Sequence, residues 1–115
     1  MRAAALVLLA GLALAGPAAA RAPDWRVYAD CSAAYSVNAD IKDPDRSPSM
    51  TTQVTELSNQ YADAADLRYR RQMRASPHQA LRAVRARYVR QVRLYKAKPR
   101  EAVERIIDAC PQPPD

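Results

Sequence analysis

The sequence predicts an all-α protein, a small up-down helical bundle of about four helices closed by one disulfide. Both glycines lie within the first 16 residues, so residues 21–115 contain none, and alanine is abundant throughout. This composition favours helices, because alanine has the highest helix propensity and glycine one of the lowest. The prolines fall where helices would begin or end. No segment shows the apolar–polar alternation, rich in Val, Ile and Thr, that is typical of strands.

Residues 1–20 have the three-part order of a cleavable secretory signal peptide. Arg2 provides the charged start, an apolar run extends from Ala3 to Ala15, and three alanines follow Gly16-Pro17. The alternative, an uncleaved membrane anchor, is disfavoured because the run is shorter than the ~20 apolar residues that span a bilayer. We therefore expect a periplasmic or secreted protein, bacterial in origin given its excess of Arg over Lys, with no transmembrane segment in the mature chain. The remaining residues suffice for one domain, a helical domain at 21–110 with a disordered tail at 111–115.

The two cysteines, Cys31 and Cys110, are predicted to form a structural disulfide, which an oxidising compartment permits. No Cys-x-x-Cys motif points to redox exchange or haem attachment. With His78 as the single histidine, neither a metal site nor a cofactor is expected. A bridge closing a loop of roughly 80 residues stabilises the fold by about 4.5 kcal/mol on the loop-closure model.

The first helix is expected from about Asp24 to Asp40, entered through Pro23. Tyr28, Cys31 and Tyr35 share one face at helical spacing, which directs Cys31 inward with Val27 and Ala34 beside it. The following segment, 42–48, is polar and interrupted by prolines, so it is expected to be an exposed loop.

The second and third helices are expected to form an antiparallel hairpin; the alternative is a sharp kink between them. Ser47-Pro48 predicts the start of a helix that continues to about Ala75. Ser76 followed by Gln79 is a capping-box pattern that opens a third helix, Pro77 to about Ala97. The predicted inner stripe of the second helix is Met50, Val54, Leu57, Tyr61, Ala65, Tyr69 and Met73; that of the third is Leu81, Val84, Tyr88, Val92 and Tyr95.

A short fourth helix is expected to open at Lys98-Pro99-Arg100-Glu101 and to end before Pro111. Its inner side would carry Val103, Ile106, Ile107 and Cys110. A Cys31–Cys110 bridge would then hold this last helix against the first.

Charge is strongly segregated along the chain. Between Arg68 and Arg100 there are twelve Arg or Lys and no Asp or Glu, whereas residues 21–67 carry four basic and eight acidic groups. The block predicts a basic surface that could bind an anion. The alternative is a solvated face whose charge is partly neutralised by Asp63, Asp66, Glu101, Glu104 and Asp108. The candidate anion-binding residues are Arg82, Arg85, Arg90 and Arg93 on the third helix, with Arg68, Arg70, Arg71 and Arg74 on the second.

Three functions remain open at this point. The first is an exported non-enzymatic protein that binds an anionic envelope component or an acidic protein through the basic surface. The second is a periplasmic chaperone or inhibitor that acts through apolar surface after the hairpin at Ser76-Pro77 loosens. The third is a small enzyme with an unrecognised site, which would need His78 beside two carboxylates, since no nucleophile elbow, phosphate-binding glycine loop or His-Glu-x-x-His motif is present. Nucleic acid is not expected as a partner, because export separates the protein from the genome.

Overall fold

The computed structural model describes residues 23–114, and the predicted signal peptide at 1–20 lies outside this range. Four α-helices account for most of the described chain, and these residues form no strand. The prediction of a small all-α bundle closed by a disulfide is confirmed. The helices are α2 (Trp25–Asp40), α3 (Pro48–Met73), α4 (Pro77–Lys96) and α5 (Arg100–Asp108).

The helix boundaries follow from local capping chemistry. Asp24, Ser47 and Ser76 cap the N-termini of α2, α3 and α4, each accepting a hydrogen bond from a nearby backbone N–H. Ser76 and Gln79 form the predicted capping box in both directions. Arg74 ends α3 in the left-handed conformation, with φ 48° and ψ 46°. This tight turn reverses the chain and produces the expected hairpin between α3 and α4.

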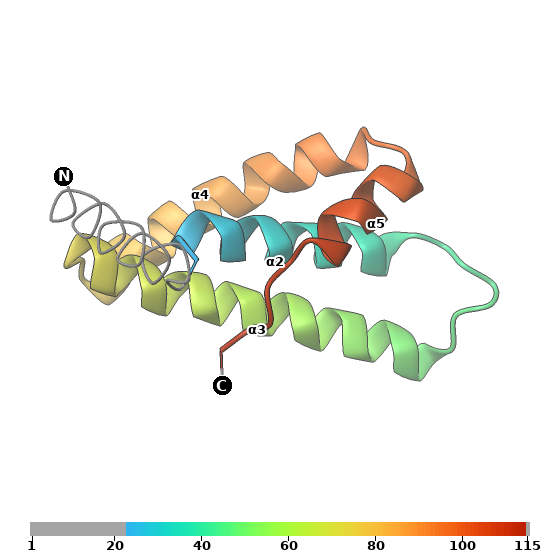
Figure 1. The fold of residues 1–115 in the computed structure, drawn as a ribbon, viewed down its shortest axis with the longest axis horizontal. Helices are drawn as coiled ribbons and strands as arrows, with labels where there is room; N and C mark the ends of the chain where they lie inside the picture. Colours follow the sequence, from blue (N-terminus) through green and yellow to red (C-terminus); the bar gives the residue numbers. More distant parts are fainter. Residues whose placement is uncertain (1–22, 115) are drawn as a thin grey trace, which may run out of the picture.

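Helix α2 lies between α3 and α4 (Figure 1) and contacts both more extensively than they contact each other. Its small side chains make this close approach possible, since Ala29, Ala33 and Ala34 are fully buried. Ser32 and Ser58 join α2 to α3 by reciprocal bonds, in which each hydroxyl donates to the other residue's carbonyl at 2.8 Å. The buried hydroxyls are thus satisfied, as a buried polar group requires.

The core consists of two clusters arranged along α2. The first joins the N-terminal half of α2 to α3 and to Val84 of α4, and it contains an edge-to-face contact between Trp25 and Tyr69, with ring centroids 4.9 Å apart. The second joins the C-terminal half of α2 to Tyr95 of α4 and Val103 of α5. Aromatic rings therefore supply much of the core, as their helical spacing indicates.

Four residues expected on inner faces are exposed instead: Val27, Met50, Met73 and Leu81. Met50 and Met73 lie at the ends of α3, which at 26 residues extends well beyond the 16-residue α2. Leu81 is exposed because α4 turns Ala80, Val84 and the side chain of Arg87 toward α2. The predicted inner stripes are thus wrong at these positions.

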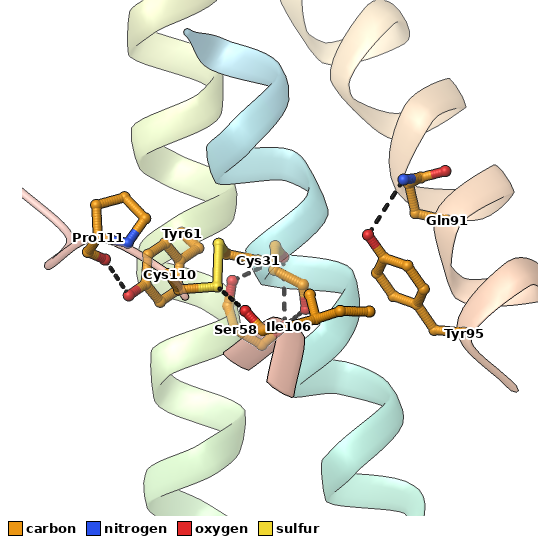
Figure 2. The surroundings of a disulfide bond; sticks show 9 residues. Cys31, Ser58, Tyr61, Gln91, Tyr95, Ile106, Cys110 and Pro111 are labelled. Carbon is orange, nitrogen blue, oxygen red and sulfur yellow. Dashed lines mark hydrogen bonds between the residues drawn. A yellow bond between two sulfur atoms is a disulfide. The ribbon is translucent and has the colours of Figure 1, made fainter. Parts of the chain in front are cut away.

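The predicted disulfide joins Cys31 to Cys110, with Cα atoms 5.9 Å apart (Figure 2). This separation is in the usual range for bridged cysteines. Cys110 follows the end of α5 rather than lying within it. Next to the bridge, the Tyr61 hydroxyl donates to the Pro111 carbonyl, and the Tyr61 ring stacks on Tyr35. The start of the C-terminal segment is therefore attached to α2 through Cys110 and to α3 through Pro111. The disorder of residues 111–115 stays a prediction.

Across the part of the chain that the structure describes, no helix has the length and apolar character needed to cross a membrane.

Candidate functional site

The predicted basic surface divides into arginines that are held by other groups and arginines that are not. Arg68 donates from Nε to the Pro23 carbonyl at 3.1 Å, and Arg70 forms an ion pair with Asp66 at 2.5 Å. Both are half-buried. The other candidates are exposed and, within residues 23–114, have no carboxylate at ion-pair distance. These are Arg71, Arg74, Arg82, Arg85, Arg90 and Arg93.

Two further arginines of the acid-free block are structural. Arg87 of α4 binds Asp30 of α2 through two parallel bonds of 2.8 and 2.9 Å, and hydrogen bonding to this carboxylate raises the pKa of Arg87. Arg100 bridges Asp43 in the 41–47 loop and Glu104 in α5. The hydrogen bond from Arg100 lowers the pKa of Asp43. The Asp30–Arg87 and Asp43–Arg100 pairs connect separate elements, whereas Arg100 and Glu104 both belong to α5.

The outer face of α4 presents the remaining arginines together. At a rotation of 100° per residue, Arg82 and Arg93 lie opposite the buried Val84 and Tyr95, whereas Arg85 and Arg90 lie on the two flanks, about 100° and 120° from Val84. Exposed apolar side chains lie among them. A shallow hollow on this face is lined by Ala86, Val89, Arg90, Arg93, Leu94 and Ala97.

A larger cleft of about 740 Å³ opens between α3 and α4, and we call it the α3–α4 cleft. The two helices meet at the hairpin and diverge from it (Figure 1), and α2 forms the floor of the gap. Its volume is in the range of small-molecule sites. The lining residues are Ala29, Ser32, Ser58, Asn59, Ala62, Asp63, Asp66, Arg70, Pro77, His78, Leu81, Val84, Arg85, Tyr88 and Val89.

The charged side chains of the cleft come from both walls. Asp63 and the Asp66–Arg70 pair belong to α3, whereas His78 and Arg85 belong to α4. In the Asp66–Arg70 pair, Asp66 Oδ1 and Arg70 Nε are buried without a hydrogen-bond partner. Incomplete pairing of this kind reduces what a salt bridge contributes to stability.

The cleft brings His78 and two carboxylates, Asp63 and Asp66, into one lining, which is the arrangement that an enzyme would need. No hydrogen bond joins His78 to either carboxylate in the described structure. A preformed base with its orienting group would show such a contact. Among the described residues there is also no group of three or more His, Cys, Asp or Glu side chains arranged to hold a metal ion.

The sequence did not indicate the Asp30–Arg87 pair or the cleft. A signal for Arg87 was present, because it lies three residues after Val84 and beside Tyr88, at the edge of the predicted inner stripe. Of the acids expected to neutralise the basic block, Asp66 pairs with Arg70 and Glu104 pairs with Arg100. Asp63, Glu101 and Asp108 form no ion pair within the described chain.

Comparisons with known proteins add no relationship to this geometry. The chain matches no protein-family model, and neither a curated protein nor a solved structure is significantly similar to it.

Proposed function

We propose that this protein is an exported, non-enzymatic binding protein whose partner is an anionic component of the cell envelope. The contacts are made by Arg82, Arg90 and Arg93 on the outer face of α4, with Arg85 at the edge of that face beside the α3–α4 cleft. One observation carries the proposal: these side chains are exposed and unpaired within residues 23–114, whereas Arg70, Arg87 and Arg100 of the same block are paired. The structure thus separates arginines used for the fold from arginines left to solvent.

Arginine suits this role because its planar guanidinium offers several donors that match phosphate and carboxylate oxygens. Arg71 and Arg74, at the C-terminal end of α3, extend the surface. Arg68 and Arg70 contribute less, since both are half-buried and bonded to neighbouring groups. Binding between exposed charges is screened beyond about 8 Å at physiological ionic strength, so affinity should fall steeply with salt.

The test uses vesicles of phosphatidylglycerol, with phosphatidylcholine vesicles as the uncharged reference. The triple variant R82E/R90E/R93E should lose sedimentation with the anionic vesicles at low salt. The matched control is R26E/K42E/R105E, which changes the net charge equally at exposed residues outside the basic block. Because R26E removes the Arg26–Asp24 ion pair, the helix content of this control is compared with that of the native protein. Equal loss in both triples would show that net charge alone drives association, and unchanged binding of R82E/R90E/R93E would refute the proposed surface.

A second candidate, a chaperone or inhibitor acting through apolar surface, is favoured by a different observation. Within residues 23–114, seven large apolar side chains are exposed, and three of them, Leu67, Met73 and Leu81, lie toward the α3–α4 hairpin. This function predicts salt-tolerant suppression of aggregation of an unfolded client protein. The variant L67S/M73S/L81S should abolish that suppression, whereas R82E/R90E/R93E should leave it intact.

A further inference from the structure

The α3–α4 cleft is a separate feature from the outer face of α4. Its floor is formed by Ala29 and Ser32 of α2, and its apolar lining includes Leu81 and Val84 of α4. Of the four arginines in the proposed anion-binding face, Arg85 also lines this cleft, whereas Arg82, Arg90 and Arg93 do not. The cleft can therefore be tested without altering those three.

Asp63 and Arg85 occupy matching positions on the two walls. Each lies eleven residues from Arg74, the residue at which the chain reverses. At a rise of 1.5 Å per residue, Asp63 is about 15 Å from the end of α3 and Arg85 is about 12 Å from the start of α4. They are thus at similar levels of the cleft, with the carboxylate on α3 and the guanidinium on α4.

These two opposite charges do not pair with each other. Neither Asp63 nor Arg85 has an ion-pair partner within residues 23–114, although both line the same cleft. The splay of α3 and α4 keeps the two charges apart, and apolar side chains such as Ala62 and Val84 also line the gap. A ligand that complements this arrangement carries a cation at one end, an anion at the other and an apolar body between them.

We propose that the α3–α4 cleft binds a short apolar peptide with free termini. Its ammonium group pairs with Asp63, its carboxylate pairs with Arg85, and its side chains contact Leu81 and Val84. An extended peptide spans about 3.3–3.6 Å per residue, so a tripeptide separates its two charged ends by about 10 Å. The side-chain amide of Asn59 offers a hydrogen-bonding partner to the peptide backbone.

Charge complementarity selects this ligand over simpler ones. A purely anionic amphiphile would leave the Asp63 carboxylate beside its apolar body or its own charge. A zwitterionic lipid headgroup carries its two charges close together, with no apolar segment between them. A peptide alone among these places apolar side chains between separated ends of opposite charge.

The test measures calorimetric binding of trileucine, its N-acetylated form and its C-terminal amide to the oxidised protein. Removal of either terminal charge should weaken binding to the native chain by about tenfold, the change expected for loss of one charge-assisted hydrogen bond. Asp63→Asn should remove the discrimination against the acetylated peptide and retain the discrimination against the amide. Arg85→Gln should do the reverse.

Asp40→Asn and Arg105→Gln are the matched controls, because they change the same residue types at exposed positions outside the cleft and outside the anion-binding face. Both should bind trileucine as the native protein does. The reciprocal loss of discrimination cannot arise from misfolding, which would weaken all three peptides together. Equal affinity of the native protein for the three peptides, or no binding of trileucine at millimolar concentration, would overturn the inference. The vesicle assay is scored separately, so either proposal can fail while the other stands.

Discussion

Three tyrosines of the core should lower the free energy of unfolding at alkaline pH. Burial raises the pKa of the Tyr35, Tyr61 and Tyr95 hydroxyls above the ordinary value of about 10. The folded state therefore holds these protons more tightly than the unfolded chain. Their contribution to stability is fully present below about pH 10 and is lost as pH rises through the raised pKa values.

The free energy of unfolding should fall above about pH 10, and urea titrations at several pH values across that range measure this fall. Each tyrosine contributes up to about 1.4 kcal/mol per pH unit between its unfolded and folded pKa values. Tyr35→Phe removes one such group without removing a hydroxyl hydrogen bond of the described structure, so its alkaline loss should be shallower. An identical pH slope for the native protein and this variant would contradict the assignment.

The Asp30–Arg87 pair is a second residue-scale contribution, and it ties α2 to α4. About a quarter of each side chain is exposed, so the pair is partly shielded from water. Its two parallel hydrogen bonds make it bidentate. Arg87→Gln should destabilise the fold by about 1–2 kcal/mol, more than an exposed pair would. Arg82→Gln, on the outer face of the same helix, should change stability by less than about 0.5 kcal/mol. Urea denaturation of the two variants separates a structural arginine from a solvated one, and equal effects would contradict a structural role for Arg87.

At the scale of elements, the hairpin between α3 and α4 depends on Arg74, the one described residue with a positive φ. A residue with a Cβ atom is strained in this conformation, whereas glycine adopts it readily. Arg74→Gly should raise the free energy of unfolding by about 0.5–1 kcal/mol. Arg74→Ala keeps the Cβ atom and should bring no such gain. Chemical denaturation compares the two, and equal stabilisation by both would attribute the effect to lost charge rather than to backbone strain.

Element positions could be predicted from the sequence because caps and prolines act locally. Ser47-Pro48 and the Ser76–Gln79 capping box each define a boundary within a few residues. The orientation of a helix about its axis depends instead on its partners, which is why Leu81 was wrongly placed inside and Ala80 was missed. The cleft could not be predicted, because it depends on how far α3 and α4 diverge. The Asp30–Arg87 pair could not be predicted from a local pattern either, because its two residues are 57 positions apart in the sequence.

At the scale of the whole molecule, the disulfide is the covalent link that holds the end of α5 against α2. This helix has only nine residues, no side-chain cap at Pro99 and one fully buried residue, Val103. Helices this short are marginal without tertiary support. The bridge from Cys31 to Cys110 supplies that support by closing a loop of 79 residues.

Replacing both cysteines by serine should therefore lower the free energy of unfolding by about 4 kcal/mol on the loop-closure model. The loss should be uneven, with amide hydrogens of α5 exchanging faster than those of α2 and α3. Val103→Ala in the oxidised protein is the control, because it weakens the packing of α5 against the second core cluster while the bridge keeps α5 attached. Uniform loss of protection across all helices would contradict this division. Because α5 lines neither the α3–α4 cleft nor the outer face of α4, peptide and vesicle binding should survive wherever the rest of the bundle stays folded.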